Sequence, residues 1–275
     1  MVVRTRQGLA FAGRHRGYKT LTTCLREQRI IDQTVFAFHL ADNSDTENQQ
    51  SVISFGSWDV GKYALEEEFT YIDIIENSSC WQLPLSEFRI AGTILPNLTP
   101  QGAMINSRGT FIELPTKEYE LFRSKTCGTV QCDPESWDIV FQCPNGEEKR
   151  LSDMSFVLNG VTFSVSSKHY IFKRDSVCSC LVYRAEFCSL GLPFLRAYYT
   201  LFDEERLRIG LARSINFPYP SNLPKVVLVI LTGLGIALVF YLCRIYLCRR
   251  KAVEPVNEAN PANHLEPLIP ADFHA

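Results

Sequence analysis

The sequence lacks an excess of basic residues and any bias toward glycine or proline. Its 28 Lys and Arg against 30 Asp and Glu give a net charge of -2, so the chain offers no overall basic field for nucleic acid. With 15 Gly and 14 Pro among 275 residues, collagen-like and low-complexity architectures are excluded. Hydrophobic residues make up 46% of the chain, which predicts a folded protein with a buried core.

Grouped metal ligands are also missing from the sequence. The five histidines are scattered along the chain: His15, His39, His169, His264 and His274. The pairs Cys127 with Cys132 and Cys178 with Cys180 lack the two-residue spacing of zinc knuckles. We therefore expect no metal, no cofactor and no nucleic-acid partner.

An apolar run near the C-terminus predicts a membrane span. Residues 226–243, VVLVILTGLGIALVFYLC, carry no charge and are long enough to cross a hydrocarbon layer of about 30 Å. A fully buried core helix is the alternative. Four basic residues follow the run and only Lys225 directly precedes it, which places the C-terminal side in the cytosol. We predict a single-pass, type I transmembrane helix over residues 225–247, between a proline-rich stalk at 214–224 and a disordered cytosolic tail at 248–275.

The N-terminal twenty residues contain no apolar core of the kind found in signal peptides. The first twenty residues carry Arg4, Arg6, Arg14, Arg16 and Lys19, and no acid occurs before Glu27. A transit peptide or a nucleic-acid-binding arm would also fit this pattern. We expect instead that the chain start is truncated, with insertion directed by the span itself as the alternative.

The cysteines indicate an oxidising compartment for the long N-terminal part. Eight of the ten lie before residue 225, and disulfides persist in secretory compartments. The sequons at Asn77 and Asn97 are compatible acceptors of N-glycans. Cys243 and Cys248 lie at the cytosolic edge of the span, where palmitoylation and plain membrane packing both remain open. The expected location is a membrane of the secretory or endolysosomal system or the cell surface, with the N-terminal part luminal or extracellular.

Between residues 34 and 212, short alternating or apolar runs are broken by turn residues, a texture typical of antiparallel sheets. Asn159-Gly160 predicts a two-residue hairpin turn, and Asp203–Arg206 predicts a second tight connection. One helix is predicted at Thr116–Arg123, with Thr116 as its N-cap. The predicted strands are Val35–Leu40, Val52–Phe55, Phe69–Ile75, Trp81–Leu85, Ala103–Ile105, Ile139–Gln142, Phe156–Leu158, Val161–Val165, Tyr170–Phe172, Leu181–Tyr183, Tyr198–Phe202 and Arg208–Leu211.

Six local motifs occur in a fixed order along this β-rich region. They are Gly8–Phe11, Val35–Leu40, Gly56–Asp59 with Tyr63, Cys80–Leu83, Phe156–Val161 with His169–Ile171, and Leu190–Gly191 with Phe194–Asp203 and Ile209–Ala212. In this order they make residues 8–212 resemble the pepsin-like aspartic peptidases. The resemblance implies a mainly β acid-protease fold, with residues 1–40 as a remnant of the N-terminal lobe and the inter-lobe strand, and residues 41–213 as the C-terminal lobe.

The resemblance also implies proteolysis by two aspartates, one from each lobe, which share a proton and activate a water molecule. Each aspartate of the family lies in an Asp-Thr/Ser-Gly loop. The segment that matches the second loop reads Asn106-Ser107-Arg108-Gly109-Thr110. Asn106 therefore replaces the aspartate, and an amide has no acid–base function near neutral pH. Arg108 replaces the glycine, where a Cβ would normally have no room.

Other parts of the family's catalytic apparatus are also altered or absent. No Asp-Thr-Gly or Asp-Ser-Gly occurs in the sequence. The family's first catalytic loop and its flap tyrosine would precede Gly8. Leu192 stands where the family has an aspartate after Ile-Leu-Gly. We therefore expect the chain as written to be inactive.

Three disulfides are expected. The resemblance implies a Cys143–Cys178 bridge. Proximity in the sequence adds Cys127–Cys132 and Cys180–Cys188, and it leaves Cys24 and Cys80 unassigned. Sequence alone does not determine the connectivity.

Three hypotheses for function follow. The first is a membrane-anchored, catalytically defective pepsin-like protein that binds a peptide or protein. The second is an active aspartic endopeptidase whose N-terminal lobe is missing from this sequence. The third is a pseudogene or gene fragment that folds poorly because its sheet edges are exposed.

Overall fold

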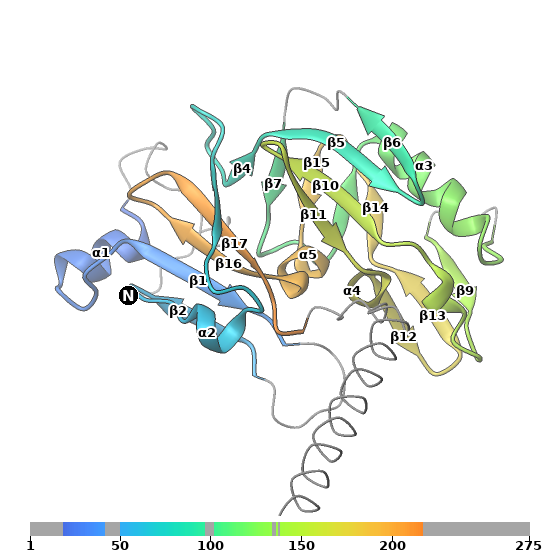
Figure 1. Cartoon of the computed structure of the whole chain (residues 1–275), viewed down its shortest axis with the longest axis horizontal. Coiled ribbons are helices and arrows are strands. Elements are labelled where there is room, and N and C mark those ends of the chain that lie inside the picture. The colour runs from blue at the N-terminus through green and yellow to red at the C-terminus, as the bar shows by residue number, and fades with distance from the viewer. Residues whose placement is uncertain (1–18, 42–49, 97–101, 134–135, 137, 217–275) are drawn as a thin grey trace, which may run out of the picture. The chain divides into compact units, whose positions relative to one another are not determined.

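The structure is a computed structural model that describes residues 19–41, 50–96, 102–133, 136 and 138–216 (Figure 1). The chain divides into two compact units, Met1–Tyr219 and Pro220–Ala275, and every described residue belongs to the first. No helix among the described residues is long and apolar enough to cross a bilayer. Several predicted features lie outside the described residues: the Gly8–Phe11 motif, Asn97, most of the 214–224 stalk, the 225–247 span, Cys243, Cys248 and the 248–275 tail.

The described unit is mainly β, as the sequence predicted. One five-stranded sheet joins the two ends of the unit in the order β2-β1-β16-β17-β3. Its strands are β1 (Val35–His39), β2 (Val52–Phe55), β3 (Thr70–Asp73), β16 (Tyr198–Asp203) and β17 (Arg208–Arg213). Phe36 lies opposite Phe202 across the β1–β16 ladder, and their rings stack with centroids 4.6 Å apart. Pairing between segments distant in sequence therefore closes the unit.

A second five-stranded sheet carries the segment of residues 106–110 that the sequence analysis singled out. Its order is β14-β8-β15-β7-β4. The strands are β4 (Gln82–Leu83), β7 (Ala103–Ile105), β8 (Ile112–Leu114), β14 (Val182–Arg184) and β15 (Cys188–Leu190). β15 lies between β7 and β8, parallel to the first and antiparallel to the second. The β7–β8 connection, residues 106–111, therefore turns around the end of β15.

Two smaller sheets complete the unit, in the orders β11-β10-β5-β6 and β12-β13-β9. Their strands are β5 (Leu85–Ile90), β6 (Thr93–Pro96), β9 (Val140–Gln142), β10 (Met154–Leu158), β11 (Val161–Val165), β12 (Ile171–Arg174) and β13 (Val177–Cys180). The predicted Asn159-Gly160 hairpin is confirmed. Both residues have positive φ, 46° and 81°, and Leu158 pairs with Val161.

The predicted turn after β16 is also present. Asp203 pairs with Arg208, and the Arg206 N–H donates to Asp203 Oδ1 at 3.1 Å. Leu207 closes the turn with a φ of 51°. The turn therefore begins at the predicted position and is one residue longer.

The predicted helix begins at the right residue but is longer than expected. α3 runs over Thr116–Cys127. Thr116 is not its N-cap, because Pro115 occupies that position and makes no side-chain cap hydrogen bond. The sequence missed the shorter helices α1 (Leu21–Glu27), α2 (Val60–Tyr63), α4 (Ser167–Tyr170) and α5 (Leu192–Ala197), and the 3₁₀ turn η2 (Glu147–Arg150). Such short helices depend on tertiary packing and carry no clear sequence period.

Buried side chains lie on both faces of β1. The main core contains Phe36, Phe38 and Phe202. A smaller cluster on the opposite face contains Val35, Ala37, Ala64, Phe69, Tyr199, Leu201 and Ala212, with Trp58, Val60 and Tyr63 packed against it. Because successive strand residues point to opposite faces, the continuous burial of β1 shows that both faces are covered.

Two of the three predicted disulfides are present, Cys143–Cys178 and Cys127–Cys132. The Cys180–Cys188 bridge is a wrong prediction, since both residues are buried free thiols. Cys180 ends β13 in the three-stranded sheet, whereas Cys188 begins β15 in the five-stranded sheet. Cys24 and Cys80 are also free.

The two disulfides should differ in their contribution to stability. Cys143–Cys178 closes a separation of 35 residues and Cys127–Cys132 one of 5. Chain-entropy arithmetic predicts losses of about 4 and about 2 kcal/mol when each pair is replaced by alanine. Urea unfolding of the two double variants measures the free energies. Equal losses would contradict this ranking.

Candidate functional site

The β7–β8 loop is held in a tight turn by its own backbone and by β15. The Asn106 N–H donates to the Leu190 carbonyl at 3.0 Å, and the Gly109 N–H donates to the Asn106 carbonyl at 3.1 Å. The Arg108 N–H donates to Asn106 Oδ1 at 3.1 Å. Asparagine side chains commonly cap turns in this way. The side chain of Asn106 thus helps to set the shape of its own loop.

The other end of the Asn106 amide is bound to a buried serine. Asn106 Nδ2 donates to Ser189 Oγ at 3.2 Å, and Ser189 on β15 has 0% exposure. The orientation of the amide follows from chemistry, because the Arg108 N–H can only donate and so must face the amide oxygen. Ser189 was not singled out from the sequence. In the sequence, Ser189 stands out only as a polar residue between Cys188 and Leu190, in a segment that the structure shows to be a buried strand.

The remaining loop residues explain how arginine is tolerated at position 108. Arg108 and Thr110 are exposed, and Ser107 and Gly109 are half-buried. A Cβ at Gly109 would lie 3.0 Å from Asn106 Nδ2. The close approach to Asn106 is therefore made by Gly109, while the side chain of Arg108 extends into solvent. The expected crowding at Arg108 does not occur.

The connection from β15 to α5 packs against the backbone of the Asn106 loop. A Cβ on Gly191 would overlap the carbonyl oxygens of Gly109 and Phe111, so only glycine fits there. The Leu192 N–H donates to the Gly109 carbonyl at 2.8 Å. Leu192 thus contributes through its backbone, whatever its side chain.

The buried acids of the described residues are engaged elsewhere. Asp203 has a 2% exposed side chain and forms ion pairs with Arg206 and Arg208 at 3.3 and 3.0 Å. Glu118 lies in the first turn of α3, where a carboxylate is favoured by the helix dipole. Neither residue belongs to the Asn106 loop. No hydrogen bond in the described part of the chain joins Asn106 to a carboxylate.

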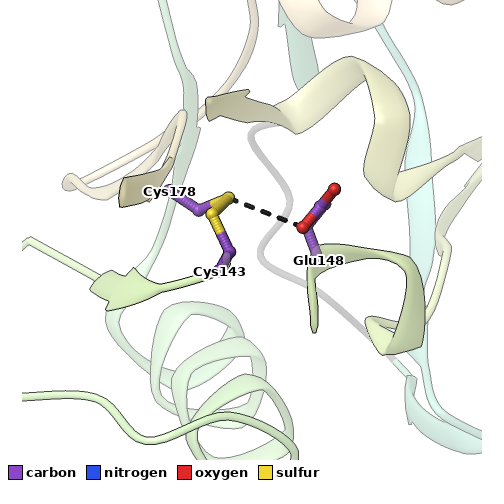
Figure 2. A group of neighbouring side chains, drawn as sticks. All are labelled: Cys143, Glu148 and Cys178. Carbon is purple, nitrogen blue, oxygen red and sulfur yellow. Dashed lines mark hydrogen bonds between the residues drawn. A yellow bond between two sulfur atoms is a disulfide. The ribbon is translucent and has the colours of Figure 1, made fainter. Parts of the chain in front are cut away.

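A second group of side chains has the composition of a metal site but not the chemistry. Cys143, Glu148 and Cys178 place their ligand atoms within 4.8 Å of one another. Figure 2 shows that the two sulfurs are bonded to each other, with Glu148 beside them. A disulfide supplies no thiolate ligand. Glu148 instead contacts Lys173 Nζ at 3.2 Å.

The free buried thiols are not nucleophile candidates. Burial raises the pKa of Cys180 to about 12, and burial also raises the pKa of Cys188. Both thiols are therefore protonated at physiological pH, and thiols in this state react poorly.

A comparison with family models identifies the fold. The model described as eukaryotic aspartyl protease matches residues 7–214. The chain belongs to the eukaryotic aspartyl protease family.

Individual relatives agree with this assignment. Vacuolar protease A of Arthroderma otae is 26% identical over 195 residues, which cover 68% of this chain and 46% of that protein. Pepsin A of Sus scrofa is 25% identical over 195 residues, covering 68% and 48%. Pregnancy-associated glycoprotein 1 of Bos taurus is 27% identical over 198 residues, covering 70% and 49%. The chain thus spans about half the length of these curated relatives.

In this aspartyl protease family member, the contribution of the Asn106–Ser189 hydrogen bond can be tested by measuring the free energy of unfolding. Ser189→Ala removes the acceptor of a half-buried amide N–H. We expect a loss of about 1–3 kcal/mol in the free energy of unfolding, because the donor is left without a partner. Urea unfolding provides the measurement.

Two further variants serve as controls for this prediction. Asn106→Asp should cost less than Ser189→Ala, because the Ser189 hydroxyl can donate to a carboxylate and the Arg108 N–H keeps its acceptor. In an Asn106→Ala background, Ser189→Ala should lose most of its effect. An unchanged cost in that background would show that Ser189 acts by another contact.

Proposed function

We propose that this chain is a catalytically defective aspartyl protease relative that binds a peptide or protein through its β-rich lobe. The observation that carries the proposal is the state of Asn106. Its oxygen accepts from Arg108 and its nitrogen donates to Ser189. The amide is therefore committed on both sides to holding the loop, and it offers no titrating group to a water molecule.

Loss of the carboxylate has a large effect on the chemistry. The family reaction needs one carboxylate as base and another as acid. A positioned acid–base group contributes about 10²–10⁴-fold to a rate. Binding of an extended ligand has no such requirement, because it needs only shape and hydrogen-bonding groups. The hydrogen-bonded Asn106 loop is compatible with binding.

We further propose that the protein is anchored in a membrane of the secretory or endolysosomal system by residues 225–247. The uncharged run and the basic residues that follow it support this proposal. The Cys127–Cys132 and Cys143–Cys178 disulfides fit an oxidising lumen. Relatives named vacuolar proteases fit the same route.

A second candidate function is favoured by one observation. The chain covers only 46% of vacuolar protease A. A longer protein that includes this chain and supplies the first aspartate would be an aspartic-type endopeptidase of altered activity. In that protein Asn106 would face a single carboxylate instead of a pair.

Peptide cleavage in acidic buffer separates the two functions. We expect the unaltered full chain to show no cleavage that a pepstatin-like inhibitor blocks. Asn106→Asp in this chain should also show none, because one carboxylate lacks its partner. The same two versions are then compared with an N-terminal lobe from an active relative supplied in the same polypeptide. There, activity should return only with Asn106→Asp.

Asn106→Gln in the two-lobe protein is the matched control, since it changes the side chain without adding an acid. Inhibitor-sensitive cleavage by the unaltered chain, alone or in the two-lobe protein, would refute the defective assignment. Binding is measured separately with a labelled statine-containing peptide. Saturable binding without cleavage is the expected result for a binding protein.

Exposure of Asn77 makes the luminal placement testable. Asn77 is exposed in the β3–β4 connection with a φ of 61°. When the full chain is made in a secretory-competent cell, enzymatic removal of N-glycans should increase its gel mobility. Asn77→Gln should reduce this shift, and Asn77→Gln with Asn97→Gln should abolish it. No shift in the unaltered chain would contradict a luminal N-terminal part.

A further inference from the structure

His39 occupies a buried aromatic site on the β1 strand. It is 3% exposed and ends the strand on the same face as Val35 and Ala37. Its ring stacks on Tyr63 of α2, with centroids 4.6 Å apart and planes at 28°. Tyr199 of β16 meets it edge-on at 6.4 Å. Nδ1 has no hydrogen-bond partner among the described residues. The imidazole therefore packs here as a neutral aromatic ring.

The charged and titratable groups around His39 do not favour its protonation, because the Lys62 cation is already nearby. From α2 come Lys62, whose Nζ lies 5.0 Å from the Tyr63 ring centroid, and Tyr63 itself. Asp59 is committed to the α2 N-terminus, where its Oδ1 accepts the Lys62 N–H at 3.0 Å. From β16 comes Tyr199, whose Oη accepts the Asp59 N–H at 3.1 Å. On β2, the residue opposite His39 is the apolar Val52.

α2 is held on the sheet by this site and by backbone contacts at its C-terminal end, where the Ile215 N–H donates to the Tyr63 carbonyl at 3.1 Å and Ala64 forms a bridge with Ser214. The helix has only four residues, Val60–Tyr63, and so short a helix is not stable by itself. Its contacts with the sheet include the Tyr63 ring on His39 and the Asp59 N–H on Tyr199. Protonation of His39 would place a cation where Nδ1 has no acceptor. Hydration of that cation requires the α2 segment to move away.

We propose that His39 is an acid-sensitive latch, which holds α2 against the β1–β16 face at neutral pH and releases residues 58–64 in acid. The inference goes beyond the proposed function and does not depend on whether the chain cleaves or binds peptides. It predicts that this face of the protein opens when the protein enters an acidic compartment.

The direction of the pH effect follows from the site. Burial first, and then the Lys62 cation, lower the pKa of His39. An exposed histidine, as in the released segment, titrates near pH 6.5. The released state therefore binds more protons, and the latch loses stability as the pH falls below about 6.5. Above that value both states hold neutral His39, and the latch is fully closed.

The pH dependence of global unfolding would combine the effect of His39 with effects of opposite sign from other titratable groups. Burial raises the pKa of Glu204, and hydrogen bonds from Thr22 and Thr20 oppose that rise. A carboxyl with a raised pKa stabilises the folded protein as the pH falls. A local measurement is therefore required.

Amide hydrogen exchange of the full chain in detergent, at about pH 7.5 and about pH 5, tests the latch. The reporters are the Tyr63 and Ala64 amides, which donate to Asp59 and Val60 carbonyls. After correction for chemical exchange, we expect peptides over residues 58–65 to exchange about tenfold faster at the lower pH. Peptides over β10 and β11, in the main core, should change far less and provide the internal control.

Variants assign the effect to His39. His39→Phe keeps a stacking ring that does not titrate, and it should remove the acid-dependent increase. Lys62→Gln should make the increase smaller, because it removes one cause of the lowered pKa. His39→Tyr provides a second non-titrating ring if the phenylalanine variant folds poorly, as judged by its exchange at neutral pH. An acid response that persists in His39→Phe or His39→Tyr, or that is absent from the unaltered chain, would overturn the proposal.

Discussion

Insertion of β15 between β7 and β8 is the constraint on which the site depends. Three residues of this strand pair with β7 on one side, and two of them pair with β8 on the other. The strand carries Ser189 to the Asn106 amide, and the following Gly191 lets the chain pass beneath the loop carbonyls. Because the backbone N–H groups of Asn106, Arg108 and Gly109 all find acceptors in this arrangement, the loop is held in a tight turn around the Asn106 amide.

Burial, more than residue type, determines what the polar side chains do. Cys180 and Cys188 are free yet inert because low polarity disfavours their thiolates. Asp203 is buried and forms ion pairs with two arginines, Arg206 and Arg208. His39 is buried beside a lysine, with no acceptor at Nδ1 among the described residues, and for it burial disfavours charge. Burial thus disfavours the charged forms of the two thiols and of His39.

The features that could be predicted from the sequence are those determined by neighbouring residues or marked by a long sequence motif. The Asn159-Gly160 turn was predictable because positive φ is tolerated by those two residues. The β16–β17 pair was predictable from its two apolar strands and the short connection between them. By contrast, β6, β8, β13, β15 and most of β5 were missed, since short strands show little period and depend on pairing with distant segments. The Cys180–Cys188 error arose because closeness in sequence does not show that the two residues belong to different sheets.

What the sequence determined by itself is the family, the mainly β class and the presence of an asparagine at position 106, because residue identity and motif order are properties of the chain alone. Tertiary structure decided how that asparagine is held. Only strand pairing brings Ser189, 83 positions away, to the Asn106 amide, and only packing of α2 on β1 and β16 turns His39 into a ring that burial keeps neutral. Hydrogen bonds and desolvation depend on distance in space, and distance in space is set by the folded sheets.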